Sequence, residues 1–475
     1  MQEAIENSTE ATPSPARKVI ESLASLKLTV TLFALGIFLT FAGTLAQVDH
    51  GIWTILEKYF RTFFAMIPMQ VFFPRSMNIP GAFPFPGGWT IGGLLLINLI
   101  LAHSLRFKVV ATGRKKVIGL LVTLVGLTLT GMVISGLFAQ QLSATEGDAF
   151  WRVAKRLIHG GLAAIVLLAG CRMLFGRQGP MVLLHGGIVI ILLSELSTGL
   201  FAKESRMTIK EGGSANYTVD IRTPELAIIQ SINDEEEKVI AVPESLIKKG
   251  QRMSHDALPF DYEVVKYFIN SDLVRPQETD AENIATDGIG LRAIAVDAGV
   301  NTGVDTRGEV DRPAAYIKLF NKQGDKKGTE IGTYLVSAGL GDSFNQPIEV
   351  DGETYNFIMR FERNYRDYEV ELVDFIHDIY PGTTIPKDYR SVVIIKDPGN
   401  DIERQVNIYM NNPLRFRGET FYQSSFIGSD TTILQVVRNH GWMAPYVACM
   451  VVGIGLIDHF CQSLFKFMRR RLKKA

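Results

Sequence analysis

The stretch NNPLRFRGETFYQSSF, residues 411–426, is polar, aromatic and strand-like, and a long apolar run begins about fifteen residues after it, at Gly441. A predicted strand directly before an apolar stretch long enough to span a membrane indicates a junction between a β domain and a membrane helix. The chain has 475 residues, which is more than one ordinary core accommodates. We therefore expect a membrane helical bundle and a large β domain, with residues 411–426 at their junction.

Composition excludes several classes of function. Lys plus Arg equals Asp plus Glu at 49 each, so the zero net charge gives no reason to expect nucleic acid as a partner. The three cysteines, Cys171, Cys449 and Cys461, lie in or beside apolar runs and form no CxxC or CxxCH motif, which predicts small buried side chains rather than disulfides. GxSxG, HExxH and phosphate-loop motifs are absent from the sequence.

Six apolar stretches are long enough to span a bilayer, which takes about 20 helical residues. They are residues 28–46, 87–107, 117–138, 157–174, 181–201 and 441–462. A polar tail, residues 1–27, precedes the first stretch, which indicates a signal anchor rather than a cleaved signal peptide. Residues 51–67 mix aromatic side chains with Glu57, Lys58 and Arg61, which predicts an amphipathic helix in the interface. An ordinary loop is the alternative for this segment.

Lys and Arg residues predict the orientation, because cytoplasmic loops carry an excess of both. They are frequent in residues 17–27, 106–116, 172–177 and 466–474 and sparse in the other short loops. We expect a multi-pass protein of the bacterial inner membrane with both termini cytoplasmic. The bundle of residues 28–201 and the final helix, residues 441–462, lie in the membrane. Residues 202–440 then form a periplasmic domain, and residues 463–475 form a basic cytoplasmic tail.

From residue 207 to residue 439 the pattern changes to short alternating strands separated by turns. Examples are ELAIIQSI, FDYEVVKYFI, AAYIKLF, YEVELVDFI, RSVVIIK and QVNIYM, with turns at Asp351-Gly352 and Pro398-Gly399-Asn400. The predicted fold class is a membrane α-helical bundle of about six spans plus an all-β periplasmic domain, a sandwich or an open barrel. Residues 270–312 are expected to form a long loop or a hairpin insertion. Two histidines, His255 and His377, are too few for an obvious metal site.

Ionisable side chains within spans are candidates for function because their burial in lipid is costly. His103, His185 and His459 each lie about three or four residues from the predicted cytoplasmic end of a span, and so at similar depth. Imidazole is a usual axial ligand of haem iron, so histidines from two helices are candidates to bracket one haem. The alternative is that each histidine only forms hydrogen bonds at the interface.

Glu195 is a second candidate, about six residues from the outer end of its span, where His159 could reach the same level. A carboxylate paired with His159 would orient the imidazole and raise its basicity. A plain hydrogen bond between two helices explains such a pair equally well. Asp458 adjoins His459 on another helix face, and we expect it to pair with a basic residue near the cytoplasmic side.

Four stretches carry a resemblance to a known family. They are SLKLTVTLFALGIFLTFAGTLAQVDHGIW (25–53), LLHGGIVIILLSELSTGLFAKESRMTIKEGG (183–213), DFIHDIYPGTTIPKDYRS (374–391) and the opening NNPLRFRGETFYQSSF. Together they resemble the ResB family, also called CcsB or Ccs1, of System II cytochrome c biogenesis, and they are spread over nearly the whole chain. Two features depart from that family: five spans precede the external domain instead of three, and His103 in NLILAHSLR is displaced by two positions, about 200° of helix. The displacement leaves the ligand role of His103 open.

The resemblance implies a function. Such proteins pair with a CcsA-type (ResC-type) membrane subunit that bears a tryptophan-rich motif. The complex presents haem on the outer face and attaches it to the cysteines of apocytochrome c. The implied cofactor is haem b, transported or transiently bound, and the implied partners are the CcsA-type subunit, apocytochrome c and haem. Because the chain shows no catalytic constellation, we expect any cytochrome c synthase activity to belong to the complex.

Two other functions remain as alternatives. One is a non-catalytic membrane scaffold or sensor whose β domain binds a ligand or partner. The other is a transporter, although internal repeats and broken helices, which transporters usually show, are not evident. In the opening stretch, Arg415, Arg417, Phe421 and Tyr422 would lie near the site where haem meets the apocytochrome. Alternatively, Phe421 and Tyr422 are core residues of a strand that closes the β domain.

Overall fold

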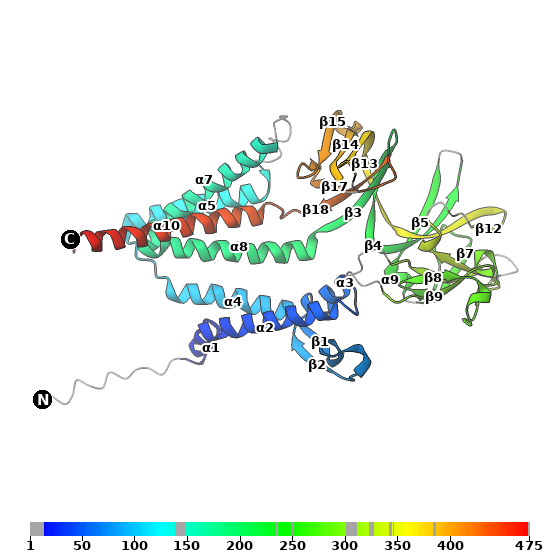
Figure 1. Ribbon diagram of the computed structural model, residues 1–475, viewed down its shortest axis with the longest axis horizontal. Coiled ribbons are helices and arrows are strands. Elements are labelled where there is room, and N and C mark those ends of the chain that lie inside the picture. The colour runs from blue at the N-terminus through cyan, green and yellow to red at the C-terminus, as the bar shows by residue number, and fades with distance from the viewer. Residues whose placement is uncertain are drawn as a thin grey trace. The chain divides into compact units, whose positions relative to one another are not determined.

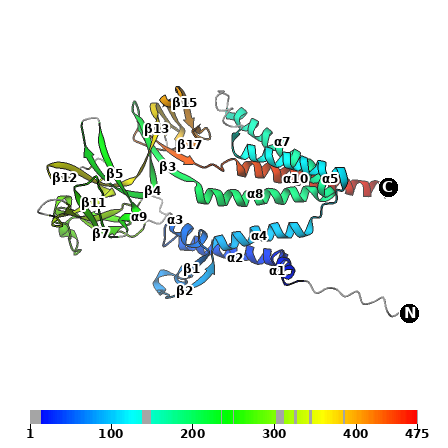
Figure 2. The ribbon, with the colours of Figure 1, turned by 180° about the vertical axis from the view of Figure 1, so that it is seen from behind.

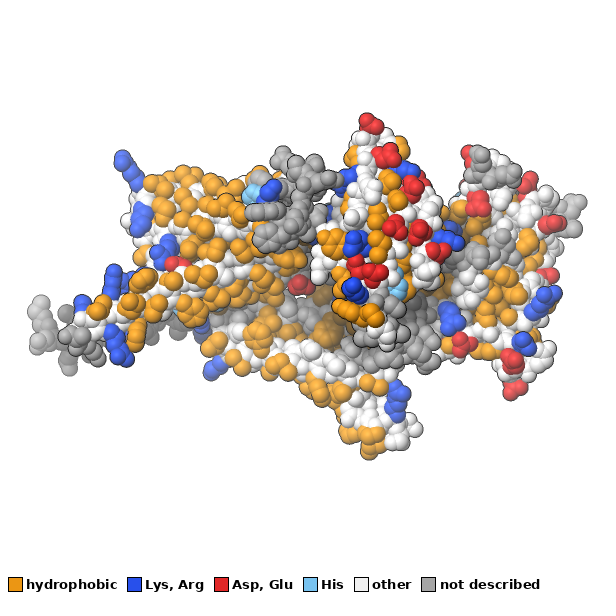
Figure 3. Space-filling view, turned by 45° about the horizontal axis from the view of Figure 1, so that its top comes forward, with side chains coloured by type: hydrophobic (Ala, Val, Ile, Leu, Met, Phe, Trp, Pro, Cys, Tyr) orange, Lys and Arg blue, Asp and Glu red, His pale blue; other side chains and the backbone are white. Residues whose placement is uncertain are grey.

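The computed structural model describes residues 14–137, 149–233, 236–248, 250–300, 311–322, 327–341, 344, 346–382 and 386–473. The chain divides into two compact units. The helical unit comprises residues 1–46, 54–203 and 438–475, and the β unit comprises residues 47–53 and 204–437. Hydrophobic side chains cover the sides of the helical unit, whereas Asp and Glu side chains are concentrated on the β unit (Figure 3).

The main helices of the helical unit are α1 (Pro15–Leu23), α2 (Leu26–Ala46), α4 (Gly88–Arg106), α5 (Gly113–Ile134), α7 (Ala149–Phe175), α8 (Gly179–Phe201) and α10 (Ala444–Leu472), shown in Figure 1. Among the described residues, five stretches are long and apolar enough to cross a membrane. One of these, Leu157–Phe201, contains most of α7 and all of α8, joined by a short 3₁₀ turn at Gly176–Gln178. Six helices therefore carry the apolar stretches, and the fold class expected from the sequence is confirmed.

Small residues allow the helices of the second half of the bundle to approach closely. A Cβ atom on Gly187 of α8 would lie 2.6 Å from Val452 Cγ2 of α10, and one on Gly170 of α7 would lie 2.4 Å from Thr123 Oγ1 of α5. Such contacts replace the hydrophobic driving force that is missing between helices in lipid. One buried cluster joins α5, α7, α8 and α10, and a separate one joins α2, α4 and the segment between them.

The segment between α2 and α4 differs from the interfacial helix expected over residues 51–67. Helical structure, α3 (Ile52–Ile55) and a π-helical turn (Leu56–Phe60), ends at Phe60, and residues Phe64–Pro68 form strand β1. Strand β1 pairs with β2 (Ala82–Pro86). A proline-containing strand is tolerated in this two-stranded sheet because an edge strand need not donate every backbone N–H. Two 3₁₀ turns, Met69–Phe72 and Arg75–Met77, lie between the strands.

The β unit consists of strands from β3 (Lys203–Lys210) to β18 (Thr431–Arg438). The largest sheet has the order β15-β14-β13-β4-β3-β18-β17-β16, with β12 (Pro347–Val350) added to β13 and β5 (Glu237–Pro243) added to β4. A second sheet has the order β11-β10-β7-β6. Its strands are β11 (Glu330–Ser337), β10 (Ala314–Asn321), β7 (Phe260–Phe268) and β6 (Arg252–Met253). The short helix α9 (Glu244–Ile247) follows β5.

Two hydrophobic cores divide the β unit into lobes. The first lobe is the part around Leu226, Phe260, Ile317 and Phe357. The second lobe is the part around Val370, Val393, Phe421 and Val436. Two long strands, β4 (Ser214–Ser231) and β13 (Glu353–Ile379), contribute residues to both cores and run from one lobe to the other, as both ribbon views show (Figures 1 and 2). The expected insertion at residues 270–312 contains a hairpin of β8 (Ser271–Val274) and β9 (Ile294–Asp297).

The opening stretch folds into a tight hairpin of the second lobe. Strands β16 (Leu414–Phe416) and β17 (Glu419–Ile427) pair antiparallel, joined by Arg417 and Gly418. These two residues have φ values of 44° and 78°, the positive pair that a type I′ turn requires. Strands β14 (Pro386–Asp397) and β15 (Ile402–Tyr409) flank the predicted turn at residues 398–400.

Candidate functional site

Helices α4 and α8 bring two of the predicted histidines together. The ring centres of His103 and His185 lie 3.9 Å apart, with 39° between the ring planes. Each Nδ1 atom lies within hydrogen-bond distance of a carbonyl oxygen one turn earlier, that of Leu99 at 2.6 Å and that of Met181 at 2.7 Å. A carbonyl oxygen only accepts, so each Nδ1 carries the hydrogen and each Nε2 keeps its lone pair. Fixing one nitrogen in this way prepares the other as a metal ligand.

The spacing of the two rings tests whether they could bracket one iron. A metal–imidazole bond of about 2 Å on each side would place the two ring centres roughly 6 Å apart. The observed 3.9 Å is shorter, so the pair as it stands does not bracket an iron. Each Nε2 by itself has the chemistry of an axial ligand, and the rings must separate before both can bind.

The histidine pair lies between helices that belong to different buried clusters of the helical unit. Helix α4 contributes Ile91 to one cluster and α8 contributes Leu183 to the other. Close to the pair, a Cβ atom added to Gly186 would meet nothing within 4 Å. The pair therefore lies at a seam between two groups of helices rather than inside one packed core.

His459, the third predicted histidine, lies on α10, where its ring is 5.8 Å from that of Phe460. One residue before it, Asp458 accepts two hydrogen bonds from Arg172 of α7, at 2.8 and 2.6 Å. This confirms the expectation that Asp458 pairs with a basic residue. One turn earlier, a Cβ atom on Gly455 would lie 3.0 Å from the Pro180 carbonyl oxygen. His459 therefore lies near the same end of α8 as His185, and its ligand role stays a prediction.

The expected pairing of Glu195 with His159 also stays a prediction. Glu195 is exposed on α8, and its neighbour Ser194 is buried. His159 is half-buried on α7. Gly161, two residues after His159, lies against α10, since a Cβ atom there would be 3.3 Å from Met450 Cε.

The charged residues of the opening hairpin pair within the second lobe. Arg417 binds the fully buried carboxylate of Asp397 at 2.8 Å. Glu419 accepts hydrogen bonds from Arg366 at 2.7 and 3.0 Å and from the Tyr368 hydroxyl at 2.5 Å. Burial, reinforced by the hydrogen bond to Glu419, raises the pKa of Tyr368. These contacts make the hairpin part of the lobe's framework.

The two aromatic residues of the hairpin differ in exposure. Phe421 is fully buried in the core of the second lobe, as the structural alternative for this residue predicts. Tyr422 is 37% exposed.

A cluster of three rings unites the two stretches that carry the most specific resemblance, residues 374–391 and 411–426. His377 of β13 stacks on Tyr389 of β14, with ring centres 4.8 Å apart and planes within 3°. Phe426 of β17 lies 4.4 Å from His377 and 5.3 Å from Tyr389. Sequence reasoning set His377 aside because histidines are few in this domain. The sequence did offer one signal for His377, namely its position within residues 374–391, one of the stretches that resemble the ResB family.

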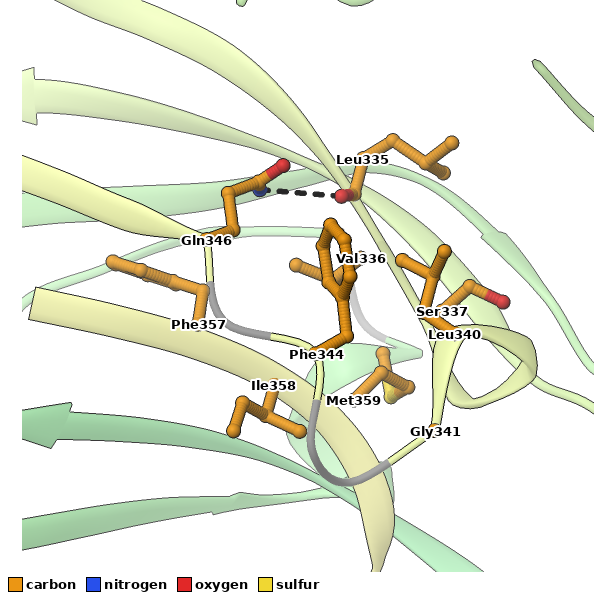
Figure 4. A pocket seen from close by; sticks show the side chains of 10 residues that line it. All are labelled: Leu335, Val336, Ser337, Leu340, Gly341, Phe344, Gln346, Phe357, Ile358 and Met359. Carbon is orange, nitrogen blue, oxygen red and sulfur yellow. Dashed lines mark hydrogen bonds between the residues drawn. The ribbon is translucent and has the colours of Figure 1, made fainter. Parts of the chain in front are cut away.

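The first lobe contains one further hollow, bordered by Leu335, Gln346 and Phe357 (Figure 4). The Gln346 side chain spans it and donates to the Leu335 carbonyl oxygen at 3.3 Å. The remaining space is about 10 Å³, roughly that of one water molecule. This hollow is too small to be a ligand site.

The apolar helices and the large β unit define a multi-pass helical membrane protein with an all-β domain before its last membrane helix. Residues 327–447 match the family model described as ResB-like family. The match includes the second lobe's hairpins and ends within α10; the helices that carry His103 and His185 lie outside it. The resemblance to the ResB family is thereby confirmed over residues 327–447.

A curated relative, Protein NrfI of Wolinella succinogenes, is 31% identical over 98 residues. The similar segment is 20% of this chain and 11% of the relative. The chain thus matches only a small part of that longer protein, and the similarity bears on one segment.

Proposed function

We propose that the protein is a ResB-like subunit of a cytochrome c biogenesis complex. Its helical unit receives haem b as cargo, and its β unit docks apocytochrome c for covalent haem attachment. A CcsA-type membrane subunit is the partner that completes the complex. The ResB-like match of residues 327–447 supports the pathway, and the histidine pair supports haem as the cargo.

The single observation that carries the haem role is the arrangement of His103 and His185. Both Nδ1 atoms are held by backbone carbonyl groups, so both Nε2 atoms keep the lone pair that an iron ligand needs. The rings touch at a seam between helices, where separation of α4 from α8 would disturb neither buried cluster. His459 and Glu195 with His159 are further candidates along the route.

For the orientation we propose that both termini are cytoplasmic and the β unit is periplasmic. The support is the concentration of basic residues at the ends of α4 and α10. Labelling of single cysteines placed at Glu349 and Lys473 with a membrane-impermeant maleimide tests this, in a background without the native cysteines. Labelling in intact spheroplasts is expected at the first position only, and the reverse pattern would refute the orientation.

Absorption spectroscopy of the full-length chain in lipid nanodiscs tests the haem role. Ferric haem should give the spectrum of an imidazole-ligated iron, and H103A/H185A should weaken binding at least tenfold. H255A is the matched control, because His255 is exposed on the β unit and far along the chain from both helices. A deletion strain should lose haem-stained c-type cytochromes. Normal c-type cytochromes in that strain would refute the proposed pathway and leave a scaffold or sensor as the function.

A further inference from the structure

The ring cluster of His377, Tyr389 and Phe426 has the features of a binding surface. Its three ring centres form a triangle with sides of 4.4, 4.8 and 5.3 Å. Each ring stands on a different strand of the second lobe, and His377 and Tyr389 are direct cross-strand partners. Groups held by paired strands keep their geometry better than groups on loops.

Alternation along the strands places the cluster at the open end of the second lobe's core. Phe375, two residues before His377, faces the same side and is 6% exposed in the core, opposite Ser391. Ser391 hydrogen-bonds to Gln423 and Thr432 from the opposite strands at 2.6 and 2.8 Å. His377 and Tyr389 lie one step further out and are half-buried. The rings therefore rest on a closed, hydrogen-bonded base.

The imidazole of His377 is available to a ligand. Within the described residues its nitrogens form no hydrogen bond, and neither nitrogen is among the buried side-chain atoms that lack a partner. Among the described residues, both nitrogens are thus without a protein hydrogen-bond partner. The ring is held by aromatic contacts alone, in contrast to His103 and His185, whose Nδ1 atoms bind backbone carbonyl groups.

We propose that the His377–Tyr389–Phe426 cluster is an iron-porphyrin site of the β unit, with His377 as an axial ligand and the two aromatic rings as apolar contacts for the macrocycle. An imidazole nitrogen is the commonest protein ligand of haem iron, and aromatic rings beside it favour a large flat ligand over a small hydrated ion. The proposal rests on haem being the cargo. It adds a holding point on the β unit, distinct from the membrane histidines.

The test uses the full-length chain in nanodiscs in the H103A/H185A/H459A background, which removes the three membrane histidines predicted as ligands. Ferric protoporphyrin IX is titrated and followed by its Soret band, with empty nanodiscs subtracted, and the iron–histidine stretch is recorded by resonance Raman spectroscopy after reduction. The background protein should retain one site with a single imidazole ligand. Adding H377A should weaken that site at least tenfold and remove the iron–histidine stretch, while adding H255A should change neither.

Two further measurements separate ligation from simple contact. In H377G, added imidazole should restore an iron–imidazole stretch in the reduced protein. Metal-free protoporphyrin IX should bind the H377A protein and its parent equally, because it has no iron to ligate. Far-UV circular dichroism and the thermal midpoint should show that the variants stay folded.

Retention of the iron–histidine stretch in H377A would overturn the proposal, as would a loss of metal-free porphyrin affinity in H377A as large as the loss of ferric haem affinity. A cluster that binds an apocytochrome peptide while ferric haem affinity is insensitive to His377 would also overturn it. These failures leave the proposed pathway intact, because that pathway is tested separately by the deletion strain and by H103A/H185A.

Discussion

Replacement of Glu419 by Gln tests whether the opening hairpin is held by its buried charges. The carboxylate is 5% exposed and binds Arg366, which is 20% exposed, through two hydrogen bonds. It also accepts a 2.5 Å hydrogen bond from Tyr368. The amide of Gln keeps the shape but removes the charge, so Arg366 is left without a counter-charge in a largely dry site.

The expected loss of stability follows from the burial of the pair. Removing one partner of a buried ion pair costs about 3–5 kcal/mol. Arg366 keeps hydrogen bonds to the carbonyl oxygens of Asn364 and Tyr365, so we expect the lower end, about 3 kcal/mol. For a unit of residues 204–437, this corresponds to roughly 6–12 °C in the thermal midpoint.

Thermal unfolding of the full-length protein in nanodiscs, followed by far-UV circular dichroism in the strand region, measures this shift. Hydrogen exchange of β13 and β17 peptides assigns the loss to the second lobe. Glu349→Gln, an exposed carboxylate on β12, is the matched control and should shift the midpoint by about 1 °C or less. Equal midpoints for the two variants would show that the Glu419 network contributes nothing and would refute the reasoning.

Three further predictions concern packing, turns and pH. Gly187→Ala should lower the thermal midpoint of the helical unit, because the added Cβ atom would lie 2.6 Å from the Val452 side chain. Gly186→Ala, where a Cβ atom meets open space, is the control and should leave the midpoint unchanged. Equal midpoints for the two variants would contradict the α8–α10 contact. Gly418→Ala should lower the free energy of unfolding of the β unit by about 1 kcal/mol, because the φ angle of Gly418 is 78°. Gly399→Ala should lower it by less. Chemical unfolding measures both values, and equal losses of stability would rule out the type I′ turn. The pKa of Tyr368 is raised in the folded protein, so the stability of the β unit should be intact below the ordinary tyrosine pKa near 10 and should fall above it. Tyr368→Phe should reduce this loss of stability at alkaline pH. A pH profile of stability that is the same in this variant would contradict the prediction.

The membrane helices and strands could be predicted because their signals are local. A span needs only a run of apolar residues, and strands such as β7 and β18 show their alternation within eight or nine residues. The same local signal failed for residues 64–68. Their partner strand lies at residues 82–86, and a sequence window that ends at residue 67 does not contain it.

The candidate sites were only partly predictable because they depend on contacts between distant segments. The depth of His103 and His185 followed from counting residues, but the contact of their rings depends on how α4 packs against α8. The cluster of His377, Tyr389 and Phe426 depends on the register of β13 with β14 and on where β17 lies. No periodicity within one segment contains that information.

The strands β4 and β13 have a consequence for how the external part of the protein can evolve and be dissected. Directly between the two cores, Arg360 of β13 pairs with Glu225 of β4 at 2.8 Å, and both side chains are nearly inaccessible. The lobes share continuous backbone instead of a tether, so neither can be excised, exchanged or duplicated as an independent module without cutting strands inside the sheet. We therefore expect related proteins to contain both lobes or neither. Insertions and deletions are expected at the turns and not within β4 or β13.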